Sequence, residues 1–256
     1  MIILNKELAI ATITLNRRQA ANALSKDLLV QLKDTLNSLR NDRQVRCIII
    51  TGSGEKVFCA GADLKERKEL PESEIRHAVS LIGQTFSLIE TMPQPVIASI
   101  NGLALGGGME LALACDVRIA STNASFSLPE TSLGIIPGAG GTQRLPRLIG
   151  IAKAKELIFT GKRLIATDAE KLGLITKAVP PLALKEETKQ LAQTIIRNAP
   201  IALAEAKKAV YYGMQTDLQT GLQIEEWCYD VTIPTKDRIE GLRAFAEKRQ
   251  PQYKGE

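Results

Sequence analysis

A glycine-rich segment between a predicted buried strand and a predicted helix constrains the fold of this chain more than any other feature. Residues 95–100 (PVIASI) predict a buried strand, residues 101–110 read NGLALGGGME, and residues 111–115 (LALAC) predict a helix. Glycine has no Cβ, so its backbone can approach a neighbouring chain or a ligand closely. The first turn of a helix leaves backbone N–H groups without partners. The segment therefore predicts an α/β unit with amide donors gathered at one spot.

Glu110 places a carboxylate within one turn of these amide donors. A phosphate site would avoid this negative charge and would favour Lys with Ser or Thr. Amide donors beside a carboxylate suit a neutral substrate whose oxygen becomes negative during reaction, which is an oxyanion hole with an acid or base next to it. The alternative is a tight strand–helix turn in which Glu110 is a solvated first-turn residue.

Two more segments combine small residues with an acidic side chain. Residues 57–64 (VFCAGADL) follow the apolar run 45–51, and Asp63 can cap a following helix. Glu130 lies among apolar residues and glycines, where loss of contact with water would raise the pKa of its carboxyl. Two strand ends could each supply an amide to one carbonyl oxygen, with two carboxylates nearby. Alternatively, Glu130 is a residue of a surface loop.

Predicted strands alternate with predicted helices along the chain before a helical C-terminal region. The strands are predicted at residues 8–15, 45–51, 96–100, 117–120 and 175–179. Ser25 is predicted to cap a helix whose leucines recur at helical spacing. The C-terminal helices are predicted at residues 182–198, 201–212, 217–229 and 235–248. This alternation indicates an α/β fold with largely parallel strands, and periodicity alone does not distinguish a spiral from a doubly wound sheet.

Composition places the chain among ordinary globular proteins. It has 256 residues, of which 45% are hydrophobic and 24% charged, which allows a sizeable core. The sequence contains no run of eighteen apolar residues, so no transmembrane helix is predicted. The N-terminus does not resemble a signal peptide. The cysteines show no metal-ligand spacing and are predicted to be buried, reduced thiols. These features predict a cytoplasmic location. The cysteines are Cys47, Cys59, Cys115 and Cys228.

The motifs and their spacing resemble the crotonase (enoyl-CoA hydratase/isomerase) superfamily over essentially the whole chain. The matching segments are residues 60–64 (AGADL), 101–110, 129–130 (PE) and 137–144 (PGAGGTQR). The C-terminal residues 224–226, 232–242 and 254–256 are especially similar to the methylglutaconyl-CoA hydratase subgroup. The resemblance implies an α/β, crotonase-like spiral of ββα units over residues 1–195, which carries the active site. It also implies a C-terminal helical trimerisation region over residues 196–256.

The resemblance implies roles for four residues. The N–H groups of Ala62 and Gly107 are expected to bind the thioester oxygen of an acyl-CoA. Glu110 is expected to act mainly on a water molecule, and Glu130 to exchange a proton with the α-carbon. Amide donors that bind a developing enolate oxygen more tightly lower the barrier. No metal and no redox cofactor is expected.

The resemblance also implies contacts to the CoA part of the substrate. The residues expected to bind substrate or CoA are Ala60, Asp63, Leu64, Lys56, Lys65, Gly138, Phe245 and Lys248. Phe245 and Lys248 match positions that reach the CoA of a neighbouring subunit, so a homotrimer or a hexamer built as a dimer of trimers is expected. Lys248 could alternatively belong to a solvated helix face.

Having glutamate at both catalytic positions favours hydration, because isomerases of this superfamily generally need only the base at position 130. An enoyl-CoA isomerase remains the alternative. The expected substrate is a short-chain or branched 2-enoyl-CoA, with 3-methylglutaconyl-CoA as the leading candidate. Its distal carboxylate would need a cation or a polar group. Arg67, Lys68 and Arg76 lie in a lid predicted over residues 65–87, and the sequence does not choose among them.

A net charge of +5 raises one alternative from another class, a crotonase-fold protein with an RNA-binding side activity. Lys26, Lys33 and Arg40 recur every seven residues and could form one stripe on a helix. Such a stripe is usually a solvated helix face. Aromatic residues for stacking on bases make up only 4% of the chain, so nucleic acid is not an expected partner.

Overall fold

The computed structural model describes residues 1–256, and its strands form two sheets. In the six-stranded sheet the order is β1-β2-β3-β5-β7-β10, and only β1 and β2 pair antiparallel. Its strands are β1 (Ile2–Glu7), β2 (Ile10–Leu15), β3 (Cys47–Gly52), β5 (Val96–Ile100), β7 (Val117–Ser121) and β10 (Lys177–Val179). The four-stranded sheet has the order β4-β6-β8-β9. Its strands are β4 (Val57–Cys59), β6 (Leu103–Leu105), β8 (Ser125–Ser127) and β9 (Leu164–Ile165).

The chain winds through both sheets in repeated turns. One strand of each turn joins the large sheet, the next joins the small sheet, and helical segments follow. This pattern recurs in β3–β4, β5–β6 and β7–β8, which are parallel to one another within each sheet. The ββα spiral expected from the sequence is therefore the observed architecture.

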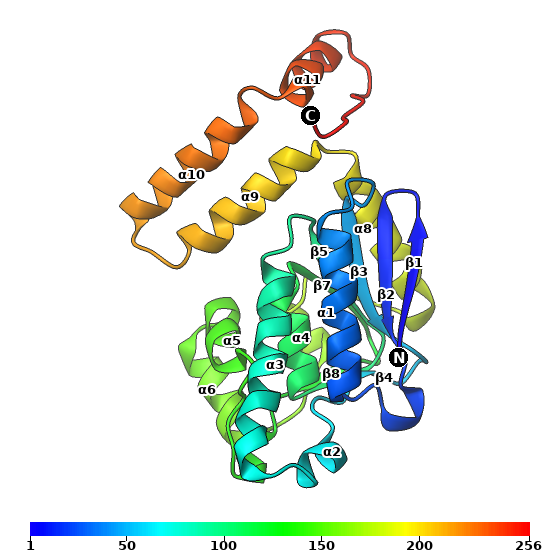
Figure 1. The fold of residues 1–256 in the computed structure, drawn as a ribbon, viewed down its shortest axis with the longest axis vertical. Coiled ribbons are helices and arrows are strands. Elements are labelled where there is room, and N and C mark those ends of the chain that lie inside the picture. The colour runs from blue at the N-terminus through cyan, green and yellow to red at the C-terminus, as the bar shows by residue number, and fades with distance from the viewer.

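Helices cover both faces of the large sheet (Figure 1). They are α1 (Lys26–Arg40), α2 (Leu64–Lys68), α3 (Glu72–Glu90), α4 (Gly107–Ala114), α5 (Gly141–Ile149), α6 (Ile151–Thr160), α7 (Ala166–Lys171), α8 (Leu184–Ile196), α9 (Pro200–Gly213), α10 (Leu218–Thr232) and α11 (Lys236–Ala246), with short 3₁₀ turns at Arg18–Ala20 (η1), Glu130–Leu133 (η2) and Pro181–Ala183 (η3). Helix α3 packs against both α1 and α4 over the main core, and α8 packs on β3, β5 and β7. Because both faces are covered, the central strand β5 is buried along its whole length.

Local sequence signals explain where α1 begins and which face it buries. Ser25 is the N-cap, and its side chain accepts a hydrogen bond from the N–H of Leu28. The five leucines of the helix are all buried. The predicted cap and the predicted apolar face are both confirmed. The leucines are Leu28, Leu29, Leu32, Leu36 and Leu39.

Two sequence-based expectations about local structure were incomplete. The single strand predicted at residues 8–15 is the second arm of a hairpin, in which Leu8 turns the chain at φ 55°. Strand β1 is exposed along nearly its whole length and lacks the apolar alternation that would have signalled it. The lid predicted over residues 65–87 is too long, because Ile82, Thr85 and Phe86 of α3 are buried in the core.

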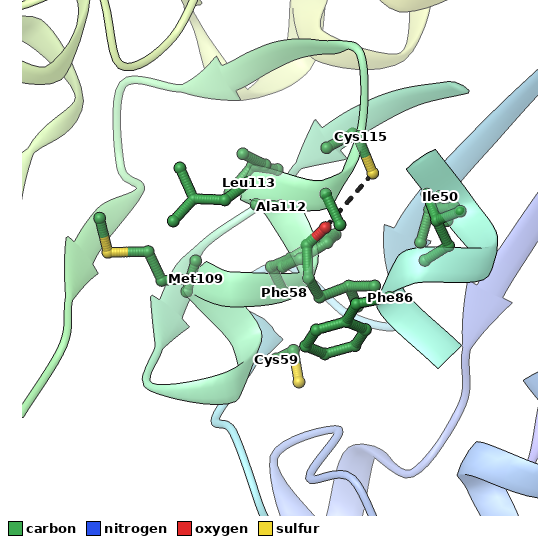
Figure 2. Close-up of a cluster of buried hydrophobic side chains, with 14 of the residues drawn as sticks. Ile50, Phe58, Cys59, Phe86, Met109, Ala112, Leu113 and Cys115 are labelled. Carbon is green, nitrogen blue, oxygen red and sulfur yellow. Dashed lines mark hydrogen bonds between the residues drawn. The ribbon is translucent and has the colours of Figure 1, made fainter. Parts of the chain in front are cut away.

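The core around α4 combines side chains from several elements. Figure 2 shows Phe58 and Cys59 of β4 gathered with Phe86 of α3 and Ala112 of α4. All four cysteines are free and buried, as predicted. Burial raises the pKa of the Cys59 thiol to about 12, so this side chain acts as a small apolar group in the core.

Helices α9, α10 and α11 project away from the two sheets as an arm (Figure 1). Lys207 of α9 ties the arm to the body. Its ammonium donates to Asp116 Oδ2 at 2.7 Å and to the carbonyl oxygens of Ile89 and Gln94. The side chain of Lys207 is only 10% exposed, so this ion pair is shielded from solvent. None of the helices combines the length and apolarity needed to cross a membrane.

We predict that Lys207→Met lowers the free energy of unfolding by about 2 kcal/mol, because it leaves the Asp116 carboxylate without its cation. Urea unfolding followed by circular dichroism measures the change. Lys208→Met is the matched control, because Lys208 is half exposed and pairs only with Glu205 one helical turn away. Equal destabilisation by the two variants would show that the shielded ion pair does not anchor the arm.

Candidate active site

The two amides expected to bind an oxyanion lie side by side. Gly107 is the first residue of α4, so its N–H has no partner within the helix. Around Ala62, the flanking groups Gly61 C=O and Asp63 N–H both bond to Leu24, so the N–H of Ala62 points the other way. A Cβ built on Gly107 would lie 3.5 Å from the Ala62 nitrogen. The Ala62 amide and the start of α4 therefore lie close together.

Glycines make this approach possible. A Cβ on Gly61, whose φ is +91°, would lie 2.7 Å from the Leu105 carbonyl oxygen and 3.0 Å from the Gly107 nitrogen. A Cβ on Gly108 would lie 2.0 Å from the Cys59 carbonyl oxygen. Side chains at these positions would push the β4 turn away from the start of α4. The tight strand–helix packing considered for these glycines is therefore observed, and the oxyanion hole stays a prediction.

Glu110 is buried beside these amides and is held by two hydrogen bonds. The N–H groups of Ala139 and Gly141 both donate to Glu110 Oε1, each at 2.8 Å. Burial raises the pKa of Glu110, whereas these two N–H bonds act in the opposite direction by stabilising the carboxylate. Because Oε1 accepts both of these hydrogen bonds, the Glu110 side chain has a fixed orientation. The idea that Glu110 is a solvated first-turn residue is wrong, because it is only 3% exposed.

Sequence reasoning missed this clamp on Glu110. The glycine-rich residues 137–141 were recognised as a motif, but no signal indicated that their amides face Glu110. The side chain of Arg144 secures the loop by donating to the Ala139 carbonyl oxygen and by a bidentate ion pair with Glu90. A Cβ on Gly141 would lie 3.0 Å from Glu110 Oε1, which explains the small residue there.

Glu130 begins the turn η2 and is also buried. Burial is the main reason why its pKa rises to about 7, and the neighbouring negative charge of Glu110 raises it further. Glu130 Oε2 is buried without a hydrogen-bond partner. Glu130 Oε1 lies 2.8 Å from the position that a Cβ on Gly106 would occupy, so Glu130 faces the segment that leads into Gly107. The predicted rise in pKa is confirmed, and the surface-loop alternative is wrong.

The remaining predicted site residues are spread over a wider area. Ala60 and Gly138 lie near the site, and Gly138 faces Val79 of α3. The Asp63 carboxylate is already used, because it caps α2 and pairs with Arg17 at 2.9 Å. Leu64, Lys56 and Lys65 are exposed. Phe245 and Lys248, at the end of α11, are also exposed and lie at the opposite end of the molecule from α2 (Figure 1).

A cavity opens next to Ala62, between α1, α2 and α3. Its apolar lining includes Leu24, Leu70 and Leu81, and its polar lining includes Arg67 and His77. Neither Glu110 nor Glu130 lines it. No cluster of His, Cys, Asp or Glu side chains is arranged to hold a metal ion.

The cation stripe considered for RNA binding does not form an open surface. Lys26 is exposed, but Lys33 and Arg40 are half-buried. The Arg40 guanidinium donates to the carbonyl oxygen and the hydroxyl of Thr91, which ties α1 to the end of α3. Arg40 therefore serves packing between helices.

Comparisons with known proteins agree with the fold and the motifs. The enoyl-CoA hydratase/isomerase family matches residues 5–256. A crystal structure of enoyl-CoA hydratase from Bacillus anthracis is similar with a TM-score of 0.98 and 54% identity, covering 100% of this chain and 99% of that one. YngF of Bacillus subtilis (strain 168), which carries the same family name, is 57% identical over 96% of this chain and 94% of its own length. Human mitochondrial methylglutaconyl-CoA hydratase is 49% identical over 96% of this chain and 74% of its own length. The chain belongs to the enoyl-CoA hydratase/isomerase family and has the crotonase fold.

The geometry predicts that the Glu130 carboxyl titrates at about pH 7 and that Glu110→Gln lowers its pKa, because the variant removes a neighbouring negative charge. Carbon-13 NMR of labelled glutamate side chains, assigned with Glu130→Gln, measures this titration. Glu156 is the internal control, because salt bridges to Lys153 and Lys162 lower the pKa of its carboxyl to about 2. A Glu130 titration near its ordinary value of 4.5 would contradict the burial described for this site.

Proposed function

We propose that the chain is an enoyl-CoA hydratase that adds water across the α,β double bond of a short-chain or branched 2-enoyl-CoA. One observation carries the proposal: two buried glutamates with raised pKa values lie beside the neighbouring amides of Ala62 and Gly107. Family membership and the names of the relatives support the same reaction. In this proposal the N–H groups of Ala62 and Gly107 bind the thioester oxygen, and the two glutamates handle the protons.

The different surroundings of the glutamates support different roles. The two N–H bonds to Glu110 favour its ionised form, which can orient a water molecule and accept its proton as the water oxygen attacks the β-carbon. With a pKa of about 7, Glu130 is partly protonated at neutral pH and can give its proton to the α-carbon. The product is a 3-hydroxyacyl-CoA. Proton exchange with solvent then restores the starting ionisation of the pair.

The oxyanion hole explains why the double bond becomes reactive. As water attacks, negative charge develops on the thioester oxygen, and the two amides stabilise it without having to reorganise. One such donor typically contributes about 3–4 kcal/mol to transition-state stabilisation. Positioned acid and base groups add roughly 10²–10⁴-fold. The proposed reaction needs no metal and no redox cofactor, because the chain's own groups supply each step.

The leading substrate is 3-methylglutaconyl-CoA, supported by the 49% identity to the human relative of that name. We also propose assembly into a trimer or a hexamer through residues 196–256. Support comes from large exposed side chains on the arm, among them Trp227 at 64% and Phe245 at 87%. Such an assembly would let Phe245 and Lys248 reach the CoA bound to a neighbouring copy.

The proposal predicts that the protein hydrates crotonyl-CoA and that Glu130→Gln and Glu110→Gln each lower kcat by at least about 10²-fold. Each variant removes one proton-transfer group and leaves the side chain nearly the same size. Loss of enoyl absorbance measures turnover, and binding of the product to each variant by calorimetry checks that the site is intact.

Either variant keeping nearly normal turnover would contradict the two-glutamate mechanism. A wild-type protein that does not hydrate crotonyl-CoA or 3-methylglutaconyl-CoA would refute the hydratase proposal. The next test would then be a 3-enoyl-CoA, the substrate of the isomerase alternative.

A further inference from the structure

Arg67 is distinguished from the other cations near the site because it is half-buried and also has no partner. Arg17 pairs with Asp63, and Arg144 pairs with Glu90 through two hydrogen bonds. The guanidinium of Arg67 takes part in no salt bridge and donates no hydrogen bond, although the residue is half-buried. A guanidinium carries five donors and is always charged, so one that is partly withdrawn from water and unpaired is available to an anion.

The position of Arg67 connects the cavity with the catalytic carboxylates. Arg67 lies on α2, which begins two residues after Ala62, and both residues line the same cavity. Its charge also acts on Glu110 and Glu130, lowering the pKa of each against the effect of burial. A substrate whose thioester oxygen sits on the Ala62 amide would therefore have its acyl group near this guanidinium.

The other cations of the predicted lid lack this position. Lys68 and Arg76 are exposed and do not line the cavity. Lys26 and His77 line the cavity, but both are exposed. The cavity is also lined by three acidic residues. Asp63 pairs with Arg17, and Glu66 accepts a hydrogen bond from the backbone N–H of Lys26. Glu74 is exposed on the first turn of α3. Arg67 is thus the half-buried cation without a partner.

Electrostatics makes such a cation necessary for one class of substrate. An acyl group with its own carboxylate brings a further negative charge close to Glu110, whose two N–H bonds favour the ionised form. Like charges in a partly desolvated site repel strongly. A planar guanidinium offsets this repulsion by donating two parallel hydrogen bonds to the carboxylate.

We infer that Arg67 is the receptor for a distal carboxylate on the acyl group, so that the site is selective for dicarboxylic enoyl-CoA substrates. This inference rests on the proposed hydratase function and refines its substrate class. Arg67 is in this view a specificity residue that contacts the substrate away from the reacting carbons.

The test compares glutaconyl-CoA with crotonyl-CoA, two thioesters that differ only in the distal carboxyl group. The measured quantity is the ratio of their kcat/KM values. Loss of the Arg67 charge also perturbs both glutamates, but that effect is common to the two substrates and cancels in the ratio. We expect the wild-type ratio to favour glutaconyl-CoA and Arg67→Met to lower it by at least about 30-fold. Arg67→Lys keeps the charge without the two-donor geometry and is expected to fall in between.

Lys68→Met and Arg76→Met are the matched controls, because each removes a neighbouring exposed cation. Both are expected to leave the ratio within about twofold of the wild-type value. Equal loss of the ratio in a control and in Arg67→Met would overturn the inference, since the effect would then be one of general charge. A wild-type protein that hydrates crotonyl-CoA but does not prefer glutaconyl-CoA would also overturn it and leave the hydratase proposal standing. Turnover of neither thioester would refute the hydratase proposal itself.

Discussion

The backbone at Gly108 lies so close to the carbonyl oxygen of Cys59 that a Cβ would sit 2.0 Å from it. This contact joins two successive turns of the spiral, β3–β4 and β5–β6 with α4. A similar restriction acts at Gly102, where a Cβ would lie 2.1 Å from the Lys56 carbonyl oxygen. Because these backbones are in contact, the amides of Ala62 and Gly107 lie close together. The rest of the site depends on that contact.

The two glutamates complete the arrangement from different parts of the chain. Glu110 comes from the first turn of α4, and Glu130 comes from the turn η2 that follows β8. Both are withdrawn from water, yet only Glu110 is held by backbone amides. Both carboxyls are buried, but only Glu110 accepts N–H bonds, and this difference separates their pKa values. That asymmetry is what an acid and a base require when they act on the two ends of one double bond.

Local signals in the sequence predicted much of this structure. The cap at Ser25, the buried strands and the helices of the C-terminal arm follow from periodicity and turn chemistry. The spiral did not follow from periodicity, because the choice between a spiral and a doubly wound sheet depends on which strands pair at long range. It was expected only through resemblance to a family. Strand β1 was missed because its exposed residues carry no alternating pattern.

The candidate site was predictable in its residues and less so in its contacts. Glu110, Glu130 and the glycine turns are visible as motifs, and the effect of burial on Glu130 was anticipated. The clamp from Ala139 and Gly141 was not, since backbone amides leave no side-chain signature in the sequence. Likewise, the sequence did not distinguish Arg67 from Lys68 and Arg76. The structure does, because Arg67 alone of the three is half-buried and lines the cavity.

A crystal structure of the Glu130→Gln variant with crotonyl-CoA bound tests the central claim most directly, because the variant should hold the substrate without turning it over. The account predicts the thioester oxygen within about 3 Å of both the Ala62 and the Gly107 nitrogens. It also predicts the α-carbon against residue 130 and a water molecule on Glu110 facing the β-carbon. A thioester oxygen that contacts neither amide, or glutamate side chains that face away from the double bond, would contradict it.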